Sequence, residues 1–305
     1  MEPNGSKDYV ELVSDLYDGT DEEMLVASLS PVVILHGLLD LKENWEKIAK
    51  DIADISVRKV YVLDMRNHGD SPKISTMMLE EMVNDVENFL KKINEPVVLI
   101  WHSLGGIVAM ELAFQKSYLL KELIIIDTTA LRIPTMEEEL FSYMCSFLRT
   151  VLTNITPDSF LKMKSIVENR LKGIIKISSL RKIIMSNLIQ VDNQLKLKAN
   201  IDIIETEIWK SIRKRYPLRG FYGNDTLLIY GSSDYVLYTQ LHFQISSLRK
   251  IIMSNLIQVD NQLKLKANID IIETEIWKSI RKRYPLRGFY GNDTLLIYGS
   301  SDYVL

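Results

Sequence analysis

The sequence has very little cysteine and no long apolar run. Cys145 is the only cysteine among 305 residues, so an internal disulfide is excluded and a reducing compartment is favoured. No apolar stretch reaches the roughly 20 residues that a membrane-spanning helix needs. The polar, acid-containing residues 1–8 do not have the pattern of a signal or transit peptide. We therefore expect an intracellular protein without a transmembrane segment.

A large excess of charge of one sign is also missing. Lys and Arg number 37 and Asp and Glu number 40, which gives a formal net charge of −3. This balance gives no electrostatic argument for binding nucleic acid or an anionic membrane surface. The densest basic stretch, residues 210–219, lies near the end of a helical pattern, where cations stabilise the helix dipole. Because 47% of the residues are hydrophobic, the chain can bury a large core.

An identical internal repeat occupies the last part of the chain. Residues 177–237 recur without a change at 245–305, and residues 238–244 join the two copies. Repeat proteins normally stack several diverged copies between atypical end units, so one perfect duplication does not fit that architecture. A recent partial duplication or an error in gene assembly accounts for it better. We predict one domain over residues 1–237, with the second copy as an appendage and no further strand after the first copy.

Short apolar runs alternate with helical patterns along the first half of the chain. Apolar runs bounded by turns predict buried strands at residues 32–35, 59–63, 96–102 and 123–126, and again late in the chain at 226–230. Strands that alternate with helices in this way predict an α/β protein with a mostly parallel sheet covered by helices on both faces. Ligands of such sheets bind beyond the carboxyl ends of the strands.

Two further segments complete the predicted architecture. From residue 134 to about 215 the pattern is wholly helical, which predicts a helical cap over residues 134–223 above a core formed by 8–133 and 224–237. Residues 8–17 and 24–29 are expected to form a β-ribbon around the turn Asp18-Gly19.

A turn between a strand and a helix is predicted at Ser103. The apolar run that ends there is followed by Gly105 and Gly106 and then by apolar residues at helical spacing. Such a turn lifts one side chain off the end of the sheet, beside a helix N-terminus and backbone N–H groups that stabilise negative charge. Ser103 is therefore a candidate nucleophile, and the alternative is an ordinary helix N-cap.

Three ordered motifs resemble those of the α/β-hydrolase family and its small bacterial esterases. They are His36-Gly37-Leu38-Leu39, the loop from Asp64 to Ser71, and His102-Ser103-Leu104-Gly105-Gly106, and the similarity runs from about residue 8 to 237. The last motif resembles the nucleophile elbow G-x-S-x-G, except that Trp101 stands where a small residue is normal, which predicts crowding at the turn. The resemblance implies a serine hydrolase acting on a small carboxylic ester, a thioester or a lipid, with no metal ion and no cofactor.

The resemblance also implies the other parts of the site. The backbone N–H groups of Leu38 and Leu104 are expected to form the oxyanion hole. Asp127 and Asp234, each just beyond a strand, are favoured jointly as the carboxylate that orients a catalytic histidine, and Asp202 in the cap is the third candidate.

The chain has four histidines. His36, His68 and His102 lie within the motifs, where structural roles are expected. In the family the catalytic histidine follows the acid after one more helix and strand, whereas His242 comes eight residues after Asp234. That span is too short, which predicts a fold cut short at its C-terminal end and esterase activity near background. A non-catalytic binding protein and a mis-assembled fragment of an active hydrolase are the alternatives. The resemblance points to mitochondria, and the cytoplasm is the alternative compartment.

Overall fold

The structure is a computed structural model, and all structural statements concern the residues that it describes. These are residues 8–19, 29–102, 105–126, 135–155, 159–176, 178–192, 194–215, 226–231, 256–259, 262–265 and 294–299.

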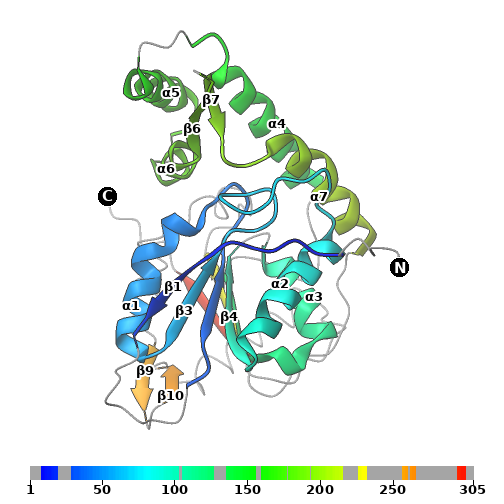
Figure 1. Ribbon diagram of the computed structural model, residues 1–305. Helices are drawn as coiled ribbons and strands as arrows, with labels where there is room; N and C mark the ends of the chain where they lie inside the picture. The colour runs from blue at the N-terminus through cyan, green and yellow to red at the C-terminus, as the bar shows by residue number, and fades with distance from the viewer. Residues whose placement is uncertain are drawn as a thin grey trace, which may run out of the picture.

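A seven-stranded sheet forms the centre of the molecule (Figure 1). The strands are β1 (Ser14–Asp18), β2 (Val32–Leu35), β3 (Lys59–Leu63), β4 (Val97–His102), β5 (Leu120–Ile126), β8 (Thr226–Gly231) and β11 (Thr294–Gly299). Their order is β1-β3-β2-β4-β5-β8-β11, and every neighbouring pair is parallel except β1 with β3. The predicted α/β class with a mostly parallel sheet is confirmed.

Helices cover both faces of this sheet. The helix α1 (Glu46–Ser56) packs on one face, and α2 (Leu79–Ile93) and α3 (Gly105–Gln115) pack on the other (Figure 1). Successive side chains of a strand point to opposite faces, so Val33 and Leu35 of β2 pack with α2 and α3, whereas Val32 and Ile34 pack with α1. Both faces are buried, which explains why the strands are continuous apolar runs. The remaining short helices are η1 (Lys42–Trp45) and η2 (Ser117–Leu119).

A cap lies above one end of the sheet (Figure 1). It consists of α4 (Thr135–Leu152), α5 (Phe160–Ile174), α6 (Ser178–Ser186), β6 (Leu188–Val191), β7 (Gln194–Leu197) and α7 (Ile201–Arg215). Ile204 and Ile208 of α7 are fully buried in the same apolar cluster as the side chains of α2 and α3. The cap and the sheet therefore share one core. None of the described helices is both long and apolar enough to cross a membrane.

The prediction of a wholly helical cap is wrong at β6 and β7, which pair as an antiparallel hairpin. Each strand has only four residues, and so short an alternation of apolar and polar residues does not distinguish a strand from a helix by periodicity. Asp192 follows β6 with φ of 49°, a left-handed conformation that aspartate tolerates in tight turns.

The edge strand β1 also differs from its prediction. It spans Ser14–Asp18 rather than residues 8–17, and it pairs antiparallel with β3, with Ser14 opposite Leu63. Residues 24–28 of the expected ribbon lie outside the described residues.

The prediction that no strand follows the first copy is wrong as well. The second copy contains β9 (Leu256–Val259) and β10 (Gln262–Leu265), which repeat the pairing of β6 with β7, and the strand β11. β11 pairs in parallel with β8, and each residue lies opposite its own duplicate, from Thr294 beside Thr226 to Gly299 beside Gly231. An identical apolar strand can use the open edge of the sheet, so this part of the second copy is not an appendage.

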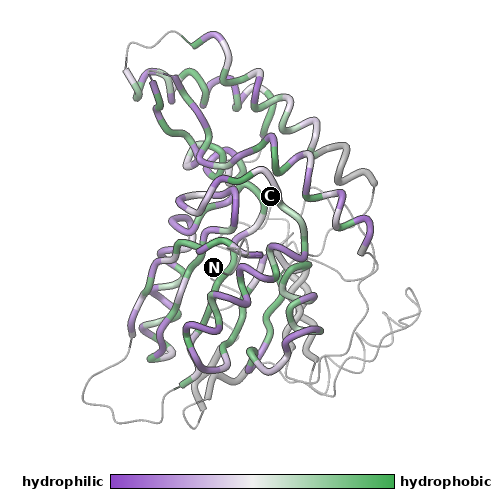
Figure 2. Tube along the Cα trace, turned by 45° about the vertical axis from the view of Figure 1, so that its right-hand side comes forward, coloured by the Kyte–Doolittle hydropathy of each residue, from purple (hydrophilic) through white to green (hydrophobic). Residues whose placement is uncertain are grey.

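Apolar residues follow the strands and the inner sides of the helices, whereas hydrophilic and hydrophobic residues alternate along the helices of the cap (Figure 2). The carboxyl ends of the parallel strands face the cap (Figure 1). This edge is where the motifs of the predicted site lie.

Candidate active site

The predicted elbow is flanked by described elements on both sides. β4 ends at His102 and α3 begins at Gly105, so two residues, Ser103 and Leu104, connect the strand to the helix. Both lie outside the described residues. The candidate acids Asp127, which directly follows β5, and Asp234, which comes three residues after β8, also lie outside them, as does His242.

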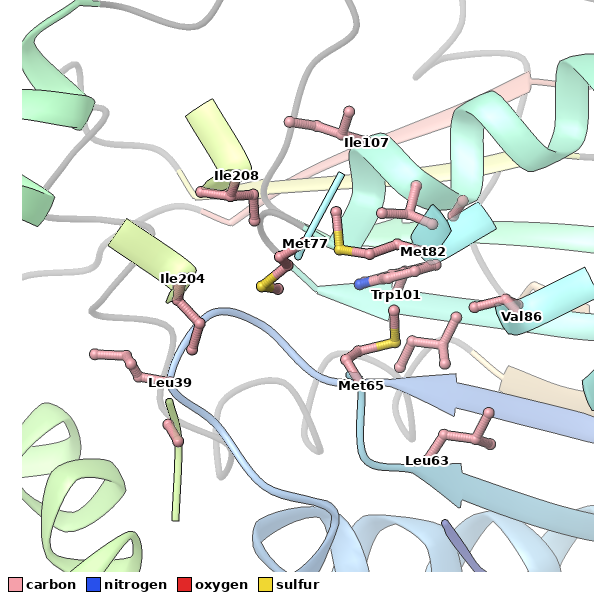
Figure 3. Close-up of a cluster of buried hydrophobic side chains, with 14 of the residues drawn as sticks. Leu39, Leu63, Met65, Met77, Met82, Val86, Trp101, Ile107, Ile204 and Ile208 are labelled. Atoms are coloured by element: carbon pink, nitrogen blue, oxygen red, sulfur yellow. The ribbon is translucent and has the colours of Figure 1, made fainter. Parts of the chain in front are cut away.

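Trp101 packs beneath the first turn of α3. Its side chain is completely buried, and Figure 3 shows it between Met65, Met77 and Met82. A Cβ atom built on Gly105 would fall on the indole Nε1 of Trp101. Only glycine at position 105 leaves room for the indole, and the close approach of Nε1 to this backbone agrees with the crowding that Trp101 predicts.

A small cavity lies at this position. It has a volume of about 20 Å³, about enough for one water molecule. Its lining consists of His36, Gly37, Leu38, Met65, His68, Met77, Met82, Trp101, Gly105 and Val108. Within the described residues the buried Nε1 of Trp101 has no hydrogen-bond acceptor. The cavity thus borders the first turn of α3 and the loop of the first motif.

In the loop from His36 to Asp40, only some of the backbone N–H groups find an acceptor among the described residues. The N–H of Leu39 donates to Nε2 of His68 at 3.2 Å, and the N–H of Asp40 donates to the carbonyl of Gly37 at 3.2 Å. Leu39 has φ of 58°, which turns the loop sharply between these bonds. In the described part of the chain the N–H of Leu38 donates to no acceptor. This is the group that the resemblance assigns to the oxyanion hole.

His36 and His68 fix loops and are buried. Nδ1 of His36 lies 2.7 Å from the carbonyl of Gly37, and its Nε2 accepts from the N–H of Met65 at 3.2 Å. Nδ1 of His68 lies 3.0 Å from the carbonyl of Arg66, and its Nε2 holds Leu39. Burial, together with the neighbouring His36, lowers the pKa of His68 to about 3, so the ring is neutral at pH 7. Both rings are structural, as the motifs predict.

His102 faces the side of the sheet covered by α1. Its ring lies 6.1 Å from that of Trp45, and its buried Nε2 has no partner among the described residues. Burial lowers the pKa of His102 to about 4, although the nearby Asp40 carboxylate acts in the opposite direction. The imidazole is therefore neutral at pH 7.

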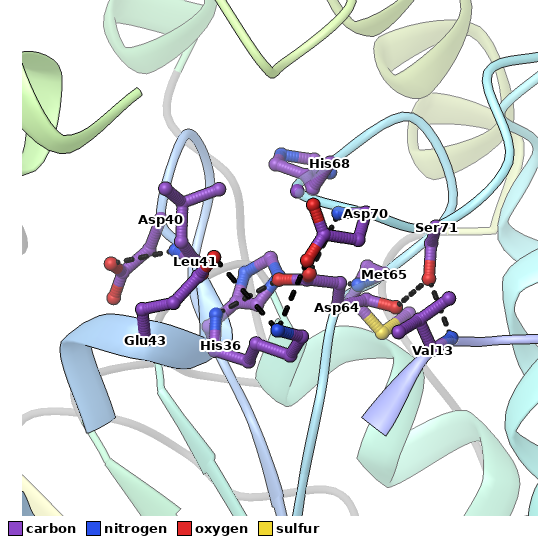
Figure 4. A network of polar contacts seen from close by, with 12 residues as sticks. Val13, His36, Asp40, Leu41, Glu43, Asp64, Met65, His68, Asp70 and Ser71 are labelled. Atoms are coloured by element: carbon purple, nitrogen blue, oxygen red, sulfur yellow. Dashed lines mark hydrogen bonds and ion pairs between the residues drawn. The ribbon is translucent and has the colours of Figure 1, made fainter. Parts of the chain in front are cut away.

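The loop from Asp64 to Ser71 is held by one buried carboxylate (Figure 4). Asp64 accepts from the N–H of Lys42 at 2.8 Å and from the N–H of Asp70 at 2.8 Å. Gly69 has φ of +47°, and a Cβ atom there would fall on the carboxyl group of Asp64, so glycine is needed for both reasons. The hydroxyl of Ser71 donates to the Asp64 carbonyl at 2.7 Å. These bonds fix the second motif beside the first.

A buried ion pair anchors the same loop to α2. Arg66 donates from Nε to Asp85 at 2.5 Å and from Nη2 to the second oxygen at 2.8 Å, and both residues are buried. A third bond runs from Nη1 of Arg66 to Glu81 at 2.6 Å. Bidentate pairing of this kind fixes orientation as well as charge.

Three polar residues connect the cap to the rest of the fold, and sequence reasoning did not assign them a role. Nδ2 of Asn187 donates to the carbonyl of Leu39 at 2.7 Å, which ties the cap to the loop that carries Leu38. The N–H of Asn200 donates to the carbonyl of Asn67 at 2.8 Å, and the hydroxyl of Ser211 accepts from Leu79 at 2.8 Å. Asn187 and Asn200 lie within residues 8–237, the part of the sequence that resembles the family. That resemblance was the indication in the sequence that these two residues have a role.

Asp202 lies in the first turn of α7, at the surface of the cap. Its side chain is 75% exposed and accepts from Nη2 of Arg149 at 2.6 Å, and Arg149 also pairs with Glu205 at 2.6 Å. An acidic residue in the first turn stabilises the helix dipole. The described contacts of Asp202 are thus structural, and its partner is an arginine.

A larger cavity of about 440 Å³ lies between the cap and the loop that contains Lys73. Its lining combines aliphatic and basic side chains with two polar ones: Lys73, Arg149, Leu152, Ile189, Leu195, Lys196, Leu197, Lys198, Ala199, Asn200, Ile201 and Asp202. Among the described residues, no group of three or more His, Cys, Asp and Glu side chains is arranged to hold a metal ion.

Comparison with known proteins agrees with this arrangement. The family model described as the alpha/beta hydrolase fold matches residues 30–160. A solved marine microorganism esterase is 25% identical, with a TM-score of 0.59 over 96% of this chain and 92% of that chain. The chain therefore has the α/β-hydrolase fold, and its residues 30–160 match the model of that family of hydrolases.

Within that class the chain is similar to sn-1-specific diacylglycerol lipase ABHD11. It is 32% identical to the Xenopus tropicalis protein over 65% of this chain and 60% of that protein. Identity to the Mus musculus protein is 27%, over 69% of this chain and 68% of that protein. The chain thus spans about two thirds of the length of these relatives.

Proposed function

We propose that the chain hydrolyses carboxylic esters of the acyl-lipid type, with Ser103 as the nucleophile. The observation that carries this proposal is the N–H of Leu38, which has no acceptor among the described residues and lies beside a cavity that borders the first turn of α3. Ser103 and Leu104 precede that turn directly in the chain. A carbonyl oxygen that becomes negatively charged during attack by Ser103 would be stabilised by the N–H groups of Leu38 and Leu104.

The reaction follows from these groups. Oγ of Ser103 attacks the ester carbonyl carbon while a base takes the hydroxyl proton, and the oxyanion is held by the two N–H groups. Collapse of the tetrahedral intermediate breaks the bond to the alkoxide, which leaves with the proton from the base. Water then attacks the acyl-enzyme in the same way and releases the carboxylic acid and the free serine.

The base is the part of this mechanism that decides the rate. His36 and His68 have both ring nitrogens engaged in loop bonds, and His102 packs on the α1 side of the sheet. His242 is the one other histidine of the chain. It follows Asp234 by only eight residues, so we propose that this chain, with Asp127 or Asp234 as the carboxylate, lacks an efficient general base and turns over slowly. Loss of general-base assistance costs about 10² to 10⁴-fold in rate.

The substrate class rests on the cap. A cavity of about 440 Å³ has the size of a small-molecule site, and its aliphatic residues Leu152, Ile189 and Leu195 suit an acyl chain. The similar proteins are named diacylglycerol lipases. We therefore extend the acylglycerol class to this chain as its proposed substrate.

The nucleophile is tested with a fluorophosphonate probe, which labels activated serines without requiring turnover. Wild-type chain and Ser117→Ala, a change at an exposed serine of η2 beyond the opposite end of α3, should both be labelled, and Ser103→Ala should not. Labelling that survives in Ser103→Ala refutes the assignment.

The base and the acid are tested by p-nitrophenyl ester hydrolysis with the same preparations. Loss of turnover in His242→Ala, with labelling retained, identifies His242 as the base. Comparable loss in Asp127→Asn or Asp234→Asn, but not in Asp202→Asn, assigns the carboxylate. Background turnover in the wild-type chain together with Ser103 labelling favours the alternative, a hydrolase-fold protein that binds its ligand without turnover.

A further inference from the structure

The central sheet ends in two edge strands of different character. One edge is β1 and the other is β11, which is red in Figure 1. An edge strand presents a row of backbone N–H and C=O groups that can pair with another chain, unless charged side chains, proline or a β-bulge protect it. The sequences of the two edges therefore indicate which of them can bind a further strand.

The edge formed by β1 carries charge. Its five residues include the aspartates Asp15 and Asp18, whose side chains are 39% and 43% exposed. Asp15 pairs with Lys42 at 3.2 Å, and Asp18 lies 4.0 Å from Lys59. A strand added to this edge would bring its backbone and side chains against these exposed charges. β1 is thus a protected edge.

The edge formed by β11 has no such protection. The strand has the sequence Thr-Leu-Leu-Ile-Tyr-Gly, with no charged residue and no proline. Its side away from β8 pairs with no strand in the described part of the chain. Six uncharged residues rich in aliphatic and aromatic side chains are typical of segments that pair with copies of themselves.

The pairing of β8 with β11 shows that this sequence recognises itself. The two strands are identical, and they pair in register over all six residues, from Thr226 beside Thr294 to Gly231 beside Gly299. A second copy of the chain presents the same edge. Two folded copies can join these edges through a two-fold axis perpendicular to the sheet, which makes the two β11 strands antiparallel. Antiparallel pairing is slightly more stable per residue than parallel pairing.

We propose that the free edge of β11 binds β11 of a second copy of this chain, so that the two sheets form one continuous sheet. With full overlap of the six residues, the two-fold axis passes between Leu296 and Ile297, and about six backbone hydrogen bonds join the subunits. The edges that remain are the two charged β1 strands, so the assembly closes as a dimer and does not continue as a fibre. The inference does not depend on the role of Ser103.

The first test is size-exclusion chromatography of the full chain with light scattering, over a range of protein concentrations. We expect a mass of twice 35.2 kDa. Leu296→Lys places two lysines at the centre of the dimer and should raise its dissociation constant about tenfold or more. Leu16→Lys is the matched control, since Leu16 is a 49% exposed leucine of the other edge strand. It should leave the dimer unchanged, and far-UV circular dichroism verifies that both variants are folded.

The second test is disulfide cross-linking, which reports the pairing itself. Residues directly opposite each other on antiparallel strands have Cβ atoms about 4.5 to 5.5 Å apart, close to the distance that a disulfide needs. The native Cys145 is buried and does not compete. Under mild oxidation, a mixture of Leu296→Cys and Ile297→Cys chains should cross-link more efficiently than either variant alone. Leu16→Cys, on the protected edge, should not cross-link.

Four outcomes overturn the proposal. The first is a folded wild-type chain that has the monomer mass at every concentration. The second is an equal effect of Leu16→Lys and Leu296→Lys on the dimer. The third is cross-linking of Leu16→Cys, or of each single β11 variant, that is as efficient as that of the mixture, since neither pattern fits antiparallel β11 strands. The fourth is open-ended polymer in place of the dimer, because both edges would then have to pair.

Discussion

The contact between Trp101 and Gly105 predicts a strong and specific coupling between two residues of the elbow. Replacing Gly105 by alanine adds one methyl group where the indole Nε1 now lies. Gly105 is the first residue of α3 and does not have positive φ, so the backbone itself accepts alanine. The whole effect of the substitution is therefore the displacement of Trp101.

The magnitude follows from opposing terms. In a helix, alanine is up to about 1 kcal/mol more favourable than glycine. Overpacking a core costs about 1 to 3 kcal/mol, and the high end applies because Trp101 is completely buried and the methyl group would coincide with a ring atom. We expect Gly105→Ala to lower the free energy of unfolding by about 2 kcal/mol. In a Trp101→Leu background, where the ring is absent, the same change should be neutral or stabilising by up to about 1 kcal/mol.

The assay is urea unfolding followed by far-UV circular dichroism, because tryptophan fluorescence would change with Trp101 itself. Unchanged m-values identify the midpoint shifts as changes in stability. Gly173→Ala is the matched control: it is also a helical glycine, but nothing lies within 4 Å of the position of its added Cβ atom, so it should be neutral or stabilising. If Gly105→Ala costs the same in the wild-type and Trp101→Leu backgrounds, the reasoning is refuted.

Three further predictions concern buried groups. His68 and His102 have pKa values of about 3 and about 4, so between pH 6.5 and about 4 the unfolded chain binds protons that the folded chain does not. The free energy of unfolding should therefore fall with decreasing pH by about 1.4 kcal/mol per pH unit for each histidine. His68→Gln should reduce that slope in urea titrations at a series of pH values. Burial raises the pKa of Cys145 to about 12, so Ellman's reagent should react with it at pH 8 only after unfolding, and rapid reaction of the native chain contradicts its burial. Arg66→Met should lower the free energy of unfolding by about 3 to 5 kcal/mol, because it leaves the buried Asp85 carboxylate unpaired. Adding Asp85→Leu should restore most of that stability. A double variant that stays as unstable as Arg66→Met would show that the pair does more than balance charge.

The sequence by itself determined the class of the fold. Strands buried on both faces must be apolar throughout, so β2, β3, β4 and β5 were visible as short runs such as Val32–Leu35, and their alternation with helical stripes implied a parallel sheet. The order of the three motifs placed the site at the carboxyl ends of the strands. Short-range signals were weaker, since four-residue strands such as Leu188–Val191 are too short for their period to be distinguished from that of a helix.

Only the tertiary structure decided how distant parts of the chain meet. The bond from Asn187 to the carbonyl of Leu39 joins residues 148 positions apart, and no local pattern encodes such a contact. The same holds for the side chain of Trp101, whose fit depends on the space left by Gly105, and for β11, which joins the sheet because β8 has an open edge. Hydrophobic periodicity in the sequence indicates whether a residue is buried. Which side chains it contacts there depends on how whole helices and strands pack together.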